Sequence, residues 1–197
     1  MLHSIYSGKI LTRTARRGFS TMPRENSETI HIRKCTADEA GLLMPRLIGI
    51  FDAARVYMRK NGNMTQWTGG YPSEKVIMED ILAGHFHLVC RGPDGEVAGC
   101  FCFRPSPEPN YSVIEGGQWL DDGPYWVVHR LASDGSLRNV GETVLGWCME
   151  RCGNLRVDTH ADNATMLSLL ERLGFERCGT IYVEDGTPRT AFQKVLR

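Results

Sequence analysis

The chain has neither an excess of charge of one sign nor an apolar run long enough to cross a bilayer. Lysine plus arginine and aspartate plus glutamate each number 23 among 197 residues, so the formal net charge is +0. A balanced charge gives no general attraction for a polyanion, and the sequence has no basic stripe interleaved with aromatic residues. We therefore expect no nucleic-acid partner and no membrane segment.

The seven cysteines lack the paired spacing of a disulfide framework or a zinc site. Their number is odd, and most of them lie inside apolar patterns. Cys148 and Cys152 share one face of an expected helix, but no matching histidine pair stands nearby. We predict reduced thiols that act as small core residues, no bound metal, and a reducing compartment.

The length and composition suit one folded domain behind a basic leader. An apolar content of 42% and a charged content of 23% are typical of globular proteins of this size. Residues 1–24 are rich in arginine and serine and contain no acidic residue, which resembles a mitochondrial targeting segment, although Met22 could equally be the true start. We divide the chain into a leader at 1–28 and a domain at 29–197. The predicted location is the cytoplasm, with the mitochondrial matrix as the alternative.

The first part of the domain predicts a strand, then one or two helices. Residues 29–35 alternate apolar and polar side chains, as a half-buried strand does. Thr36 and Glu39 form a capping box before a helical pattern, and Pro45 is expected to kink or break that helix. After a polar, glycine-rich loop, residues 73–84 give a further capped helix.

The remainder predicts strands mixed with two more helices. Asp-Gly pairs at 94–95 and 185–186 predict hairpins, and Asp162 is expected to cap a helix that closes at Gly174. Strands are expected at 85–90, 97–103, from 127 onward, 155–160, 175–183 and 189–195, with a short extension at 111–115. This order mixes hairpins with crossovers. It predicts a mixed α/β fold with helices on both faces of the sheet.

The stretch from Val127 to Trp147 carries the first functional signal. It opens as a β-branched run, turns at Ser-Asp-Gly, and then takes up helical spacing. The start of a helix offers free backbone N–H groups and the positive end of a dipole, which favour phosphate oxygens. Gly141 in the first turn would let a bulky anion approach the backbone. A plain strand-turn-helix connection is the alternative.

Two motifs, S-L-R-N-V-G at 136–141 and an asparagine-led helix ending in Leu-Gly-Phe at 163–175, resemble those of the GNAT superfamily of N-acetyltransferases, and the resemblance covers residues 30–195. The segment 136–141, S-L-R-N-V-G, is similar to the family's Arg/Gln-x-x-Gly-x-Gly/Ala pyrophosphate loop, with Ser136 and Asn139 as departures. A second register keeps Arg138 but puts Thr143 in the last small position, and we prefer the first. The segment 163–175, N-A-T-M-L-S-L-L-E-R-L-G-F, is similar to the family's asparagine-led helix ending in Leu-Gly-Phe.

The resemblance implies a mostly antiparallel mixed sheet of about seven strands, with splayed fourth and fifth strands and helices on both faces. It also implies acetyl-CoA as co-substrate and direct transfer of its acetyl group to a primary amine of a small molecule or peptide. A non-catalytic acyl-CoA-binding or sensing module is the alternative, and a homodimer stays open. The residues implied to hold acetyl-CoA are Leu131, Ala132, Ser136, Leu137, Arg138, Asn139, Val140, Gly141, Glu142, Thr143 and Asn163.

The first candidate base is His129, because some family members use a histidine on this strand and an imidazole titrates near neutral pH. A hydrogen-bonded structural histidine is the alternative. Glu115 is the second candidate base, or else a solvated loop carboxylate. Many members carry a tyrosine general acid where this chain has Leu170, which leaves Tyr182 and Cys178 as weaker candidates.

The acceptor amine is expected to meet the loop at 61–71 and the loops between 105 and 124. Gln66, Trp67 and Tyr71 make the first loop more aromatic than a passive connection requires, although the two aromatic rings could instead cap the core. His160 and Asp158 lie at the end of a strand near the expected splay, where either could orient the substrate, although Asp158 could instead cap the turn into the next helix.

Overall fold

The computed structural model describes residues 29–196, so the predicted leader at 1–28 lies outside the described residues. Within that range, seven strands form one open sheet in the order β1-β2-β3-β4-β5-β7-β6. The strands are β1 Ile30–Lys34, β2 Phe86–Arg91, β3 Val97–Pro105, β4 Trp126–Ser133, β5 Asn154–Thr159, β6 Glu176–Tyr182 and β7 Pro188–Val195. Only β4 and β5 pair in parallel, which confirms the predicted mostly antiparallel mixed sheet.

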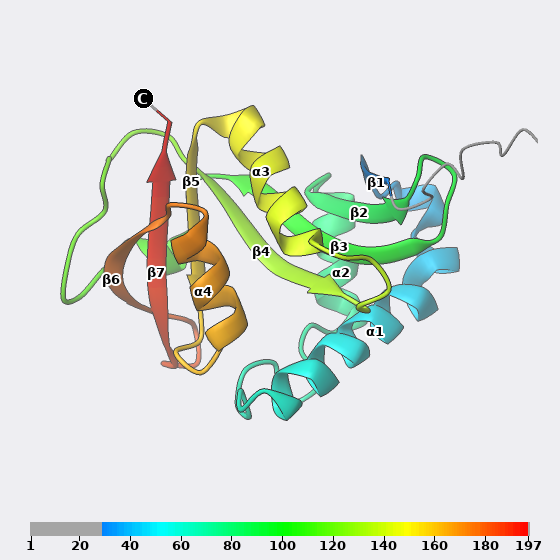
Figure 1. Cartoon of the computed structure of the whole chain (residues 1–197), viewed down its shortest axis with the longest axis horizontal. Coiled ribbons are helices and arrows are strands. Elements are labelled where there is room, and N and C mark those ends of the chain that lie inside the picture. The colour runs from blue at the N-terminus through cyan, green and yellow to red at the C-terminus, as the bar shows by residue number, and fades with distance from the viewer. Residues whose placement is uncertain (1–28, 197) are drawn as a thin grey trace, which may run out of the picture.

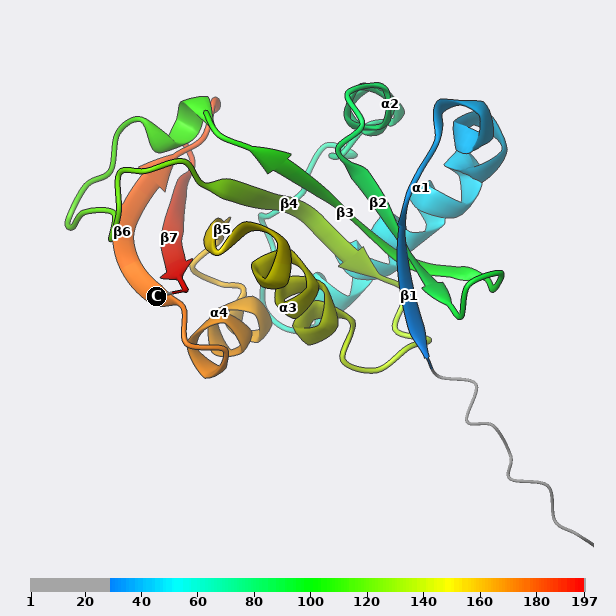
Figure 2. The same cartoon turned by 90° about the horizontal axis from the view of Figure 1, so that it is seen from above.

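Helices cover both faces of the sheet (Figures 1 and 2). They are α1 Ala37–Lys60, α2 Glu74–Leu82, α3 Val140–Cys152 and α4 Ala164–Arg172. The helices α1 and α2 pack their apolar residues on one face, around Phe51 and Phe86, and α3 and α4 pack on the other, around Phe101 and Phe192. No helix within residues 29–196 is long and apolar enough to cross a membrane.

The helix α1 begins at the predicted capping box and continues through Pro45. The Thr36 backbone N–H donates to Glu39 Oε1 at 2.8 Å. Pro45 lies inside the helix, so of the predicted kink or break, the break is wrong and the kink stays a prediction. Apolar packing of the surrounding turns against β2 and β3 outweighs the one backbone hydrogen bond that a proline removes.

The helix α4 is capped one residue later than predicted. The side-chain oxygen of Asn163, not that of Asp162, accepts from the Met166 backbone N–H at 3.2 Å. The predicted end is confirmed, because Gly174 directly follows the C-cap with a φ of 74°. A left-handed residue at this place is typical of helix ends.

The segment 111–115 does not form the predicted short strand. Residues Pro109–Tyr111 form a single 3-10 turn, η1, and only Glu115 makes an isolated antiparallel bridge, with Thr180 of β6. The Glu108 side chain accepts from the Asn110 backbone N–H and so favours the turn over an extended chain. Both predicted Asp-Gly hairpins are confirmed, between β2 and β3 and between β6 and β7.

The strands β4 and β5 separate soon after they meet, as the predicted splay requires. Their register is limited to two pairs, at Trp126 and Val127 of β4, while β4 continues to Ser133. A bulge then changes the course of β4: His129 and Ala132 pair with residues of β3 that are only two apart, so two residues of β4 face one of β3. Arg130 in this bulge has a φ of 55°.

Candidate active site

A cavity of about 1380 Å³ lies over the gap between β4 and β5. Its walls come from the bulged part of β4, the end of β5, the first turns of α3 and α4, the loop at 61–71 and the turn between β6 and β7. Small-molecule sites usually occupy about 300–1000 Å³, so this cavity has room for two reactants. Within residues 29–196, no group of three or more histidine, cysteine or acidic side chains is placed to hold a metal ion.

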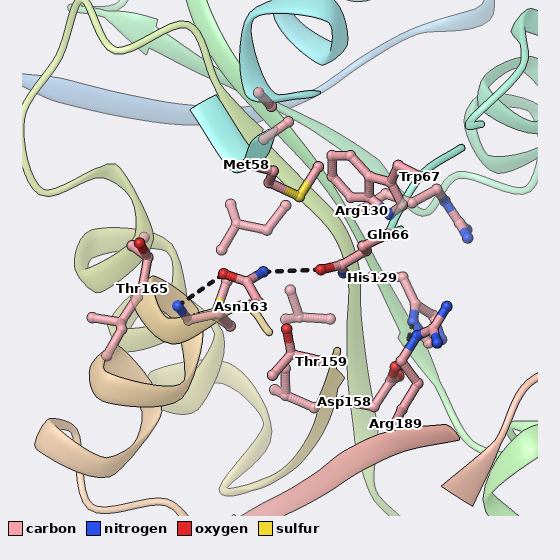
Figure 3. Close-up of a pocket in the computed structure, with 18 of the residues that line it drawn as sticks. Met58, Gln66, Trp67, His129, Arg130, Asp158, Thr159, Asn163, Thr165 and Arg189 are labelled. Atoms are coloured by element: carbon pink, nitrogen blue, oxygen red, sulfur yellow. Dashed lines mark hydrogen bonds and ion pairs between the residues drawn. The ribbon is translucent and has the colours of Figure 1, made fainter. Parts of the chain in front are cut away.

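At one end of the cavity, the imidazole of His129 lies between two carboxylates. Its Nε2 is 2.6 Å from Glu108 Oε2, and its Nδ1 is 3.7 Å from Asp158 Oδ1. Figure 3 shows His129 and Asp158 on neighbouring strands, with Arg189 of β7 among the residues that line the same cavity. The Tyr111 hydroxyl donates to Asp158 at 2.7 Å, which fixes that carboxylate. This is the arrangement of an oriented base.

Glu108 is an ionised and buried partner for this histidine. Its side chain is 3% exposed, and Arg104 forms an ion pair with it. Burial would raise the pKa of Glu108, but hydrogen bonds and charges from His129 and Arg104 outweigh it and lower the pKa to about 2. Because the carboxylate only accepts, the Nε2 of His129 carries the proton that is shared with Glu108. Nδ1 is then the nitrogen left to accept a proton.

Arg130, in the bulge of β4, is bound by residues of α2 and of the loop at 61–71. Its guanidinium forms a two-pronged ion pair with Asp80, with both hydrogen bonds at 2.7 Å. It also donates to the Tyr71 hydroxyl at 3.0 Å. The two charged side chains are nearly buried, at 12% and 11% exposure. A buried, bidentate pair of this kind fixes the bulge and therefore the backbone after it.

The loop at 61–71 reaches across the cavity to the start of α4. The Asn163 side-chain amide donates to Gln66 at 3.1 Å (Figure 3), and Thr65 and His160 share a hydrogen bond of 3.0 Å. Trp67 lines the cavity and also packs edge-on against Phe51 of α1, with ring centroids 5.5 Å apart. Its ring therefore packs on the core, as the alternative interpretation expected, and also lines the cavity, while a role in substrate binding stays a prediction.

The first turn of α3 presents free backbone donors to the cavity. Asn139, the N-cap, adopts the left-handed conformation with a φ of 57°. Within the described chain, none of the backbone N–H groups at 137–142 donates to a protein acceptor. A Cβ at Gly141 would lie 2.7 Å from Leu169 Cδ2 of α4, so the glycine lets the two helices approach closely. Free N–H groups at a helix start are suited to phosphate oxygens.

Comparison with solved structures decides the family. The crystal structure of a GNAT-family acetyltransferase from Streptococcus agalactiae superimposes with a TM-score of 0.72 and 32% sequence identity, covering 85% of this chain and 96% of that one. The chain belongs to the GNAT family of acetyltransferases. The resemblance to the GNAT superfamily is therefore confirmed. The gap between β4 and β5 is the splay that this resemblance implied.

More distant structures share the GNAT fold alone. A GNAT-family acetyltransferase from Listeria monocytogenes has a TM-score of 0.61 and 20% identity, covering 85% of this chain and 95% of the other. The polyamine N-acetyltransferase of Drosophila melanogaster has a TM-score of 0.57 and 15% identity, covering 85% and 100%. Comparisons with protein-family models and with curated proteins gave no match.

Most of the residues that the GNAT resemblance implied for acetyl-CoA line the cavity. They are Leu131, Ala132, Leu137, Asn139, Val140, Gly141, Glu142 and Asn163. Ser136, Arg138 and Thr143 are not in the cavity wall. The Ser136 carbonyl instead accepts from Arg91, which ties the loop to β2. The part of the loop that lines the cavity is therefore Leu137 together with residues 139–142.

Among the candidate acceptor and catalytic residues of this GNAT domain, the structure brings together only some. Gln66, Trp67, Tyr71 and His129 line the cavity, whereas His160 contacts the cavity-lining Thr65 from outside. Glu115 is not brought there, since its carboxylate accepts from Tyr182 at 3.1 Å near β6. Cys178 is buried with its pKa raised by burial, and neither it nor Tyr182 lines the cavity.

Three site residues were missed from the sequence: Glu108, Arg130 and Asp80. Glu108 stands in a proline-rich loop where nothing in the sequence marks a partner, and Asp80 looks like an ordinary exposed helix position. Arg130, flanked by His129 and Leu131 on a strand, carried a usable signal, since a charged residue in a mostly apolar strand needs a partner or a bulge.

Proposed function

We propose that this protein is an acetyl-CoA-dependent N-acetyltransferase that acylates a primary amine of a small molecule or peptide by direct attack. The observation that carries the proposal is the imidazole of His129, held by Glu108 and Asp158 where β4 loses its partner β5. Membership of the GNAT family supports acyl transfer as the reaction class.

The chain offers fitting groups for acetyl-CoA at both ends of the cavity. The free N–H groups at 137–142 suit the pyrophosphate, and the positive end of the α3 dipole adds to them. Beyond Val127, the edge of β4 that faces β5 is unpaired, so its backbone can pair with the extended pantetheine arm. The bulge places Leu131 and Ala132 at this open edge, where a backbone N–H can polarise the thioester carbonyl.

The acceptor amine is deprotonated at His129. With Nε2 bonded to ionised Glu108, Nδ1 accepts the proton that the attacking nitrogen loses. Asp158 lies 3.7 Å from Nδ1, so an amine seated there can also donate to this carboxylate. Glu184 and Asp185, at the turn between β6 and β7, also line the cavity, together with Arg189 of β7.

Relatives of the same fold support an amine acceptor. A mosquito arylalkylamine N-acetyltransferase-like protein, an agmatine N-acetyltransferase and the Drosophila melanogaster enzyme that forms N-acetylagmatine all share this fold. We carry over the amine as a class, not any one of these compounds.

The proposal is tested with purified protein, acetyl-CoA and a panel of amines: agmatine, spermidine, phenethylamine, lysine and a short peptide with a free N-terminus. We expect release of the CoA thiol that depends on at least one amine, with the acetylated product identified by mass spectrometry. Absence of acetyl-CoA binding in calorimetry would contradict the proposal outright.

A non-catalytic acyl-CoA-binding module is the second candidate, because Leu170 is fully buried in the core where many relatives place a tyrosine acid. Ser136, which replaces the basic or amide residue of the pyrophosphate loop, also supports this second candidate. Binding of acetyl-CoA without thiol release across the whole panel would favour this module over the enzyme.

A further inference from the structure

A buried hydroxyl without a partner faces the cavity at the end of β5. Thr159 is 1% exposed, and its Oγ1 has no hydrogen-bond partner within residues 29–196. The residue lines the cavity, and Figure 3 shows its hydroxyl pointing toward the region of Asn163. A buried hydroxyl without a partner costs stability, so its presence indicates a group that is bound only during function.

Thr159 lies on the face of β5 that packs toward Leu170. Leu170 is the position where many GNAT enzymes have a tyrosine acid. Leu155 and Val157, which share its face by strand alternation, pack in one core cluster with Leu170. Leu170 is buried, apolar and not in the cavity wall, so it cannot donate a hydrogen bond there, whereas Thr159 lines the cavity and carries a donor. Asp158, the preceding residue, points to the opposite face and contacts His129.

We propose that Thr159 Oγ1 donates a hydrogen bond to the CoA sulfur as it leaves, in the place of the missing tyrosine. This inference rests on the proposed acetyl transfer. The amine nitrogen forms the new bond to the acetyl carbon, the C–S bond breaks, and the sulfur takes the bonding electron pair as a thiolate. The proton lost by the nitrogen goes to His129 and then to solvent. The thiolate held by Thr159 takes a proton from solvent on release, so atoms and charge balance.

The first test is stability, measured without any ligand. Thr159→Val keeps the shape and removes a hydroxyl that has no partner, so the variant should unfold at the same temperature as the wild type or higher. Thr190→Val is the matched control, since Thr190 is a buried threonine directly opposite Thr159 on β7 and does not line the cavity. A Thr159→Val protein that unfolds at a clearly lower temperature would show a structural hydrogen bond and overturn the inference.

The second test is the ionisation of bound CoA, which needs neither turnover nor an acceptor. The thiol of CoA is titrated in its complex with the protein by the ultraviolet absorbance of the thiolate, with the desulfo-CoA complex as the blank for protein thiols. A hydrogen bond to the thiolate favours the charged form. We expect the thiol pKa to rise by about one to two units in Thr159→Val and to return in Thr159→Ser.

The third test is turnover with the most active amine of the panel. Thr159→Val should lower kcat by about tenfold or more with little change in KM for acetyl-CoA, because the hydrogen bond strengthens only as charge develops on sulfur. Thr159→Ser should recover most of the rate. A raised KM with an unchanged kcat and an unchanged thiol pKa would assign the hydroxyl to the pantetheine arm and refute the role at sulfur. A silent wild type would refute the proposed function, leaving the thiol titration to decide on Thr159.

Discussion

At the scale of single residues, the proposed chemistry depends most on His129. We expect His129→Gln to lower kcat/KM by about 100-fold or more and to change the dependence of kcat/KM on pH, because general-base catalysis contributes about 10²–10⁴-fold. The measurement is the pH dependence of kcat/KM for the wild type and the variant.

Glu115→Gln is the matched control for this change, since Glu115 was the other candidate base and lies away from the cavity. Its pH–rate profile should match that of the wild type. If His129→Gln instead keeps the wild-type profile, the assignment of His129 as base is wrong.

A second histidine, His87, makes the free energy of unfolding depend on pH. It is 4% exposed and stacked on Phe101, and burial lowers its pKa to about 4, which a hydrogen bond with the His85 carbonyl only partly opposes. In the unfolded chain the ordinary value is about 6.5. Between these two values the unfolded chain is protonated at His87 and the folded protein is not. The free energy of unfolding therefore falls by about 3 kcal/mol as pH drops from about 6.5 to about 4.

This loss is measured by urea denaturation at intervals across that range. In His87→Phe the titrating group is gone, so the free energy of unfolding should fall less steeply with pH between 6.5 and 4 than in the wild type. Equal slopes for the two proteins would show that His87 is not the group responsible.

The sequence showed His129 but not its partners. A histidine on a strand with the right family spacing could be singled out, whereas its carboxylate Glu108 lies 21 residues away in a loop that comes close only through the pairing of β3 with β4. Such long-range contacts depend on register and on the bulge. Neither can be read from residue types alone.

At the scale of elements, the bulge of β4 depends on the ion pair between Arg130 and Asp80. Removing one partner of a buried pair leaves an uncompensated charge, so Asp80→Ala should lower the free energy of unfolding by about 3–5 kcal/mol. It should also raise KM for acetyl-CoA, because the backbone after the bulge loses its support. Thermal unfolding and steady-state kinetics measure the two effects.

Lys75→Gln on the same helix is the control. Lys75 is 85% exposed and lies 3.8 Å from Glu79, a contact that contributes little. We expect its stability to stay within about 0.5 kcal/mol of the wild type. Comparable losses in Asp80→Ala and Lys75→Gln would contradict a special role for the buried pair.

Substitutions of Asn139, at the start of α3, test why this chain has asparagine where the family motif has glycine. Asn139 adopts a left-handed φ of 57°, which asparagine tolerates better than most residues and glycine tolerates best. Asn139→Gly should therefore keep or slightly raise stability and retain acetyl-CoA binding, while Asn139→Ala should lose about 1 kcal/mol. Denaturation and calorimetry give both values, and an alanine variant more stable than the glycine variant would contradict the left-handed assignment.

Local signals predicted the elements well where a single residue decides the geometry. The capping box at Thr36, the left-handed Gly174 and the two Asp-Gly turns are confirmed, because each acts within a few residues of chain. The errors at Pro45 and at 111–115 arose where packing between distant segments overrides local preference. The cap at Asn163 was missed by one residue because two adjacent residues can both cap.

At the scale of the whole molecule, the order of elements predicts a mixed sheet but not the splay between β4 and β5. Periodicity indicated the strands and helices, whereas the splay of β4 from β5 followed only from resemblance to a family. The opening arises because the bulge turns β4 away while β5 stays paired with β7 along its whole length. That asymmetry creates the cavity, and it places His129, Thr159 and the start of α3 around one space.

The most direct measurement is a crystal structure of the protein with a non-hydrolysable acetyl-CoA analogue. We predict the pyrophosphate on the backbone N–H groups at 137–142 and the acyl arm along β4, with its carbonyl toward the backbone of Leu131 and Ala132 and its acyl group on the His129 side. An analogue bound elsewhere, with the gap between β4 and β5 still open, would contradict the assignment of this cavity as an acetyl-transfer site.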